Sequence, residues 1–288
     1  MNLNLATKNK KNLLVKQHSI IPGFNLSFGI TVTYISLLVI LPLSMIFINS
    51  LNIGMKDIIS ILSEQRVVSA FKISFLAAAL AAFINTIFGF LIAWVIVRYD
   101  FFGKRIIDSL IDLPFALPTA VAGITLTTLY SQDGWIGKYL SLFGIKVSFT
   151  LLGIVVALSF ISIPFVVRTV QPVIENLDSE VEEAAKSLGA NSFITFIKVI
   201  FPEIIPSLLT GFSLAFARAV GEYGSVVFIS GNMPLKTEIA PLIIMTKMEQ
   251  YDYEGATVIA GGMLIISFIT LLIINLIQWY TASYHKAK

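Results

Sequence analysis

The sequence predicts an all-α integral membrane protein with about six transmembrane helices. Hydrophobic residues make up 56% of the 288 positions and charged residues only 13%, whereas a soluble domain carries about 25% charged residues. The mean hydropathy of +0.86 agrees with a chain that lies mostly in lipid. The apolar residues are also gathered into long runs, which is typical of consecutive membrane crossings.

Six apolar stretches approach the roughly 20 residues that a helix needs to cross a bilayer core about 30 Å thick. In chain order they are 26–48, 69–97, 114–131, 150–170, 205–230 and 255–278. The third is short and contains Pro114 and Pro118, so we expect it to be broken or tilted. The predicted membrane domain is therefore 26–278, between an N-terminal segment 1–25 and a C-terminal tail 279–288.

Lysine and arginine residues determine the predicted sidedness, because cytoplasmic loops carry an excess of them. With the N-terminus inside, the inner segments hold twelve of these residues and the outer segments seven. Both termini are therefore expected on the cytoplasmic side, or on the stromal side of a plastid membrane. The 171–204 loop falls on the same side.

The sequence offers no residues for metal, thiol or nucleotide chemistry. There is no cysteine, and the two histidines, His18 and His285, lie near the termini, so no His/Cys metal site is expected. The chain lacks the Gly-x4-Gly-Lys-Ser/Thr pattern of a phosphate-binding loop. No basic stripe with interleaved aromatic residues indicates nucleic-acid binding. We expect no catalytic site and no cofactor in this chain, and no nucleic-acid partner.

The 171–204 loop is expected to contain two short amphipathic helices. In the first, Ser179 followed by Glu182 matches a capping box, in which a hydroxyl and a carboxylate bind free amides of the first turn. One face repeats at helical spacing and consists of Val181, Ala184, Ala185 and Leu188. Gly189 stands where the residue after a helix adopts a positive φ.

The second predicted helix of the loop begins at Asn191 or Ser192, either of which can cap it. Its apolar face is formed by Phe193, Phe196, Ile197 and Ile200. Pro202 has no amide hydrogen with which to continue a helix. We therefore expect this helix to end near Pro202.

The first helix of the loop has the character of a docking element. Ala184 and Ala185 are small, so a neighbouring protein can approach closely, while Glu182 and Glu183 point toward polar surroundings. Such an element suits a rigid knob seated in a partner's groove. The alternative is an interfacial helix pair lying flat on the membrane, which would carry large apolar residues and many lysines. The acidic, alanine-faced helix favours docking.

The spacing Glu183-Ala184-Ala185-x3-Gly189-x9-Val199-x-Phe201-Pro202 resembles the EAA signature of ABC-transporter permeases. The resemblance implies the type I importer permease fold (MetI-like), in which this loop is the coupling helix seated in a cleft of the ATP-hydrolysing subunit. The implied coupling residues are Glu182, Glu183, Ala184, Ala185, Gly189 and Pro202. The implied partners are a second homologous permease, two ABC ATPase subunits that bind ATP-Mg, and an external binding protein that delivers the substrate.

Further blocks resemble the sulfate and thiosulfate permeases of this family; they are 112–123, 162–172, 221–232 and 236–238. The implied function is inward translocation of sulfate, and also of thiosulfate. Molybdate permeases share related blocks, so molybdate or tungstate remains the first alternative. A second alternative is an ATP-independent anion carrier or channel, which the EAA loop and the scarcity of intramembrane ionisable residues disfavour.

Two charges lie within the fifth predicted span. Arg218 and Glu222 are four residues apart, so they share one helical face, and pairing lowers the cost of about 2.5–3.5 kcal/mol for a charge at the membrane centre. They line the translocation path in one interpretation and only orient helices in the other. Thr119 and Ser225 are further candidates for the path, because hydroxyls and amides at broken helices can bind oxyanions; packing between helices is the alternative for each.

The membrane in question is a bacterial plasma (inner) membrane or a plastid membrane. The chain has 15 lysines to 5 arginines and is rich in Ile, Asn and Phe, which indicates an AT-rich genome. Both kinds of genome fit this bias.

Overall fold

The computed structural model describes residues 23–51 and 53–286, and all regular elements in these ranges are helices. The chain divides into two compact units, Met1–Ile48 and Asn49–Lys288. The described part of the first is a single apolar helical run, made of α1 (Phe24–Ile35), the π-helical segment η1 (Ser36–Ile40) and the beginning of α2 (Leu41–Leu51).

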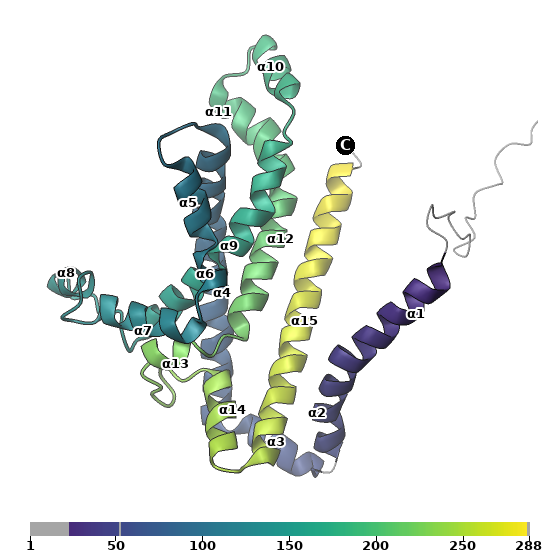
Figure 1. Ribbon diagram of the computed structural model, residues 1–288, viewed down its shortest axis with the longest axis vertical. Helices are drawn as coiled ribbons and strands as arrows, with labels where there is room; N and C mark the ends of the chain where they lie inside the picture. Colours follow the sequence, from purple (N-terminus) through teal and green to yellow (C-terminus); the bar gives the residue numbers. More distant parts are fainter. Residues whose placement is uncertain (1–22, 52, 287–288) are drawn as a thin grey trace, which may run out of the picture. The chain divides into compact units, whose positions relative to one another are not determined.

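The second unit contains the remaining helices. In chain order they are α3 (Met55–Ser63), α4 (Gln65–Arg98), α5 (Lys104–Ile111), α6 (Leu113–Ala116), α7 (Thr119–Tyr130), α8 (Gly137–Leu142), α9 (Leu151–Glu175), α10 (Ser179–Ser187), α11 (Ser192–Thr195), the π-helical η2 (Phe196–Ile200), α12 (Phe201–Val220), α13 (Val226–Ile229), α14 (Ala240–Glu249) and α15 (Tyr253–Lys286). Figure 1 shows that the long helices α4, α9 and α12 form a bundle.

Five stretches among the described residues are long and apolar enough to cross a membrane; they are Phe24–Ser50, Gln65–Arg98, Leu151–Glu175, Ser192–Val220 and Tyr253–Trp279. They confirm five of the six predicted spans. The predicted span 114–131 is broken, as expected from its prolines, and consists of α6 and the 12-residue α7. The break falls at Leu117, whose ψ of 134° is extended, because the residue before a proline disfavours the helical region.

The predicted bounds 205–230 were wrong for the span that contains α12. The helical run begins at Ser192 and ends at Val220, and Val226–Ile229 forms a separate short helix. Pro202 does not end a helix, because it lies in the first turn of α12, where a missing amide hydrogen interrupts no hydrogen bond of that helix. The second helix expected in the loop is therefore the beginning of the next span.

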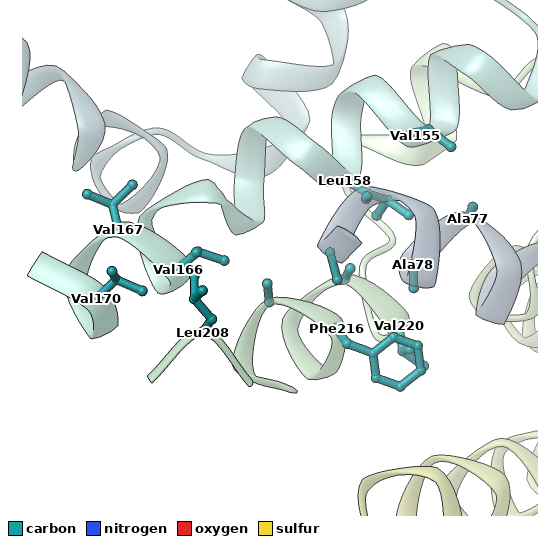
Figure 2. Close-up of a cluster of buried hydrophobic side chains, with 14 of the residues drawn as sticks. Ala77, Ala78, Val155, Leu158, Val166, Val167, Val170, Leu208, Phe216 and Val220 are labelled. Carbon is teal, nitrogen blue, oxygen red and sulfur yellow. The ribbon is translucent and has the colours of Figure 1, made fainter. Parts of the chain in front are cut away.

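The core of the second unit lies between α4, α9 and α12. Figure 2 shows side chains from all three helices meeting in one apolar cluster. On α4 the contact is made by alanines that are completely buried, namely Ala77, Ala78, Ala81 and Ala82. Small residues let helix backbones approach closely, which is how helices associate in lipid.

Pairs along these helices give their relative directions. Asn85 of α4 donates to the backbone oxygen of Ser159 and to Ser162 Oγ of α9, both at 2.9 Å. A Cβ added at Gly89, four residues further along α4, would lie 2.9 Å from Val166 of α9. Residue numbers therefore rise together, so α4 and α9 run in the same direction.

The chain must return across the bundle between α4 and α9, because these two helices point the same way. The segment that does so is α5, α6 and α7, interrupted at Leu117. α12 runs opposite to α4, since its Phe216 contacts Phe75 and its Phe201 contacts Phe90. The broken segment therefore serves as a crossing in place of one long helix.

The close contact at Gly89 generates a stability prediction. We expect Gly89→Leu to force α4 away from Val166 and to destabilise the bundle by about 1–3 kcal/mol, as overpacking does. The neighbouring Phe88 is 56% exposed, so Phe88→Leu is the matched control. Thermal unfolding in detergent, followed by size-exclusion chromatography, should show a lower Tm for the Gly89 variant only; equal Tm values would contradict the tight crossing.

Candidate functional site

The helix α10 is closed at both ends by backbone and side-chain hydrogen bonds. At its N-terminus the Asp178 carboxylate accepts from the amide of Glu180 at 2.9 Å. The predicted capping box of Ser179 and Glu182 is wrong by one residue, because Asp178 is the cap. A carboxylate satisfies the free amides and also interacts favourably with the positive end of the helix dipole.

The C-terminus of α10 confirms the positive φ that was predicted for Gly189. Gly189 has a φ of 84°, and its amide donates to the oxygen of Lys186 at 2.9 Å while the amide of Ala190 donates to the oxygen of Ala185 at 3.0 Å. These two bonds form a Schellman motif. Asn191 then caps α11, accepting from the amide of Ile194 at 2.8 Å, as predicted. The α10–α11 hairpin (residues 179–195) thus has defined ends and a defined turn.

One side of this hairpin is attached to the end of α4. Glu182 pairs with Arg98, the last residue of α4, and the Arg98 guanidinium lies 5.1 Å from the Trp94 ring centroid. The Trp94 ring meets Phe196 edge-on at 5.4 Å. Glu182 was expected to face polar surroundings, and its polar partner is Arg98 of the same chain.

The other side of the hairpin is uncovered in the described chain. Glu183, Ala184 and Gly189 are exposed, whereas Ala185 is half-buried. Leu188, at 89% exposure, and Val181, at 43%, complete the predicted apolar face. This face therefore points away from the bundle and is available to another molecule.

A second polar site lies where α12 ends. Arg218 Nη1 donates to Glu222 Oε2 at 2.7 Å, and Glu222 Oε1 accepts from the backbone amide of Ser225 at 2.9 Å and from Ser225 Oγ at 3.1 Å. Glu222 is 3% exposed. Both carboxylate oxygens are thus occupied, whereas the Arg218 side chain remains about a third exposed.

The N-terminal end of α7 packs against the same turn. A Cβ at Gly224 would lie 2.2 Å from Thr119 Oγ1, and one at Gly123 would lie 2.4 Å from the backbone oxygen of Ser225. Only glycine at these two positions allows the approach. The structure therefore brings the four predicted residues, Thr119, Arg218, Glu222 and Ser225, into one region.

Two further arginine–carboxylate clusters were not predicted from the sequence. Arg168 of α9 binds Asp108 and Asp112, and Arg66 of α4 binds Glu238, which is 1% exposed, through two bonds of 2.6 and 2.7 Å. A charge at the end of an apolar stretch needs a partner, and this signal could have indicated that both arginines are paired, although not with which carboxylates. Among the described residues, no group of His, Cys, Asp and Glu could hold a metal ion; His18 lies outside them.

A bundle of long apolar helices, with a broken crossing and a capped helical hairpin at one end, is the architecture of a multi-pass integral membrane protein. The chain belongs to the family of binding-protein-dependent transport system inner membrane components, whose model matches residues 85–284.

Among similar curated proteins is the probable sulfate transport system permease protein cysT of Nephroselmis olivacea, 50% identical over 88% of this chain and 89% of that protein. The protein of the same name from Mesostigma viride is 53% identical over 90% of this chain and 97% of that protein. The sulfate transport system permease protein CysT of Salmonella typhimurium is 45% identical over 92% of this chain and 96% of that protein.

The fold agrees with that of a solved bacterial ABC transporter involved in the import of the acidic polysaccharide alginate. The TM-score is 0.72 at 12% identity, and the match covers 89% of this chain and 95% of that one. At this identity the likeness concerns the fold. The all-helical importer-permease fold predicted from the sequence is thereby confirmed.

Proposed function

We propose that this chain is the permease subunit of an ATP-driven importer that moves sulfate, and also thiosulfate, into the cell or plastid. The observation that supports sulfate as the substrate is the identity of 45–53% to proteins named sulfate transport system permeases, over about nine tenths of the chain. These names favour sulfate over molybdate or tungstate. Membership of a binding-protein-dependent family favours an importer over an independent carrier or channel.

The α10–α11 hairpin is the proposed coupling element. Its turn is fixed by the Schellman motif at Gly189 and by the Asn191 cap, so it can transmit a push as a rigid body. Glu182 and Arg98 attach it to α4, while the exposed Glu183, Ala184 and Leu188 face outward. We propose that this face sits in a groove of an ATPase subunit, where ATP-Mg is bound and hydrolysed.

The proposed assembly contains a second homologous permease, two ATPase subunits and an external sulfate-binding protein. A solved structure of similar fold is an alginate transporter in complex with a periplasmic protein carrying an alginate pentasaccharide, and a delivering protein fits the same plan here. The charge count of the loops supports both termini on the ATPase side. Bacterial and algal relatives support a plasma membrane or a plastid membrane.

Arg218 and its neighbours form the proposed part of the anion path. Among its nitrogens, only Nη1 donates within the described chain, so Nε and Nη2 remain able to bind an oxyanion. Thr119 and Ser225 place hydroxyls in the same region. Glu222 offsets the arginine charge, which favours passage of a dianion over its tight retention.

Sulfate uptake tests the substrate assignment. In membrane vesicles containing this chain with its co-expressed ATPase, partner permease and binding protein, labelled sulfate should accumulate only with ATP. Unlabelled thiosulfate should compete at a similar concentration, and molybdate only at about tenfold higher concentration or more, which corresponds to about 1.4 kcal/mol of discrimination. Stronger competition by molybdate would favour the molybdate alternative; uptake independent of ATP would favour a carrier.

Charge reversal on the exposed face tests the coupling role. Glu183→Lys should weaken association with the ATPase subunits and lower uptake about tenfold, because a like or unpaired charge at a docking surface costs on the order of 1–2 kcal/mol. Glu249→Lys is the matched control, since it reverses an exposed charge at the end of α14. Co-purification with a tagged ATPase and sulfate uptake measure the effect. Unchanged association in the Glu183 variant would refute docking through this face.

Removal of the guanidinium tests the proposed path. Arg218→Ala should lower sulfate uptake at least about tenfold while the assembled complex retains its ATPase subunits, because the donors for the anion are lost. Arg218→Lys keeps the charge without the planar fork and should be intermediate. Full uptake by Arg218→Ala would assign the pair with Glu222 to helix orientation only.

A further inference from the structure

We infer that Arg168 is a positioning residue that links the helix entering the coupling hairpin to the broken crossing beside the anion path. This inference rests on the proposed function, because it assigns the route by which movement of α10 reaches Thr119. Arg168 itself contacts neither the proposed anion site nor the hairpin.

Arg168 holds two carboxylates with most of its hydrogen-bonding groups. It forms a fork on Asp112, with Nε to Oδ1 at 2.9 Å and Nη2 to Oδ2 at 2.7 Å. Nη1 donates to Asp108 Oδ1 at 2.6 Å, and Nη2 also donates to the backbone oxygen of Asp108 at 2.8 Å. Gln171 accepts from Nη1 at 2.6 Å. A bidentate pair fixes orientation as well as distance, so we call this set the Arg168 clamp.

The clamp is the main specific attachment of α5 and α6 to α9. α5 has one buried residue, Ile111, and α6 has one, Pro114. The ring contact of Phe115 with Phe165 at 5.2 Å is the other link. Since little apolar surface is buried here, the position of this segment depends on polar bonds. The side chains of the clamp are 31–47% exposed, so water can reach them and the bonds can rearrange.

On the α9 side, the clamp is close to the hairpin. Pro164 and Pro172 lie inside α9, four residues before and after Arg168, and prolines are the usual positions at which a helix bends. α9 ends at Glu175, and Asp178 already caps α10. A displacement of α10 therefore acts on the short α9 segment that carries Arg168.

On the other side, the clamp is close to the proposed path. Six residues separate Asp112 from Thr119, where α7 begins, and Thr119 lies against Gly224. Moving Asp108 and Asp112 with Arg168 would therefore shift the beginning of α7 relative to the 221–225 turn. The clamp thus joins the two sites through ten residues between Arg168 and Ser179 on one side and six residues between Asp112 and Thr119 on the other.

The chain contains no native cysteine, which permits a single-cysteine test. Val121, in the first turn of α7, is 47% exposed on the surface of this chain, so Val121→Cys reports on the position of α7 through its rate of labelling by a membrane-permeant maleimide. In the assembled transporter, ATP should change this rate several-fold. Adding Arg168→Gln should reduce the change to less than about twofold and lower uptake about tenfold, within the range of coupling between sites, while the ATPase subunits still co-purify.

Arg105→Gln is the matched control, because it removes an exposed arginine of α5 that forms no ion pair in the described chain; it should leave the ATP-dependent change intact. Arg168→Lys should give an intermediate ATP-dependent change in labelling and intermediate uptake. This variant provides the test if Arg168→Gln does not assemble. A normal ATP-dependent change in Arg168→Gln would overturn the inference, as would failure of both Arg168 variants to assemble. If the Val121→Cys transporter imports sulfate but ATP causes no change in labelling, the linking role of Arg168 is refuted and the proposed function stands. If ATP drives no uptake at all, the proposed function fails.

Discussion

An arginine near or within an apolar bundle must have a carboxylate partner, and this constraint organises the irregular parts of the structure. Four of the five arginines pair in this way: Arg66 with Glu238, Arg98 with Glu182, Arg168 with Asp108 and Asp112, and Arg218 with Glu222. Each of these four arginines belongs to a long helix, and its partner in every case belongs to a loop or a short helix. The guanidinium suits this task because its planar fork fixes geometry and its charge is permanent.

The long helices, by contrast, are held together with few polar groups. Alanines and glycines of α4 and α12 meet the branched side chains of α9, and Asn85 supplies the buried amide that joins α4 to α9. Close packing between small residues does not depend on the hydrophobic effect, which is weak between helices in lipid. The molecule therefore combines a rigid three-helix core with peripheral segments whose positions rest on individual ion pairs.

Much of this organisation could be predicted from the sequence, and the limits have physical causes. The lengths of the apolar stretches predicted five spans, and Pro118 predicted the break in the sixth. Gly189 and Asn191 predicted the turn of the hairpin. Each of these features depends on local chemistry. The cap at Asp178 was missed because Ser179 offered a competing local pattern. The partners of Glu182 and Arg168 lie 84 and at least 56 residues away in the chain, and no local pattern encodes such distances. The expected end of a helix at Pro202 was wrong, because proline is tolerated in the first turn of a helix and its effect depends on where that helix starts.

The π-helical segment η2 has an evolutionary consequence. It places one extra residue in the continuous run from Ser192 to Val220, between the hairpin and the packed part of α12. Loss of a single codon there would restore a regular α-helix and rotate everything before it by about 100° with a shift of about 1.5 Å. The contacts of α12 within the bundle would be untouched. The hairpin itself would be separated from α4, because Glu182 pairs with Arg98 and Phe196 of η2 packs against Trp94. A one-residue change of chain length at this place is therefore expected to be selected against, even though the loop is far from the packed core.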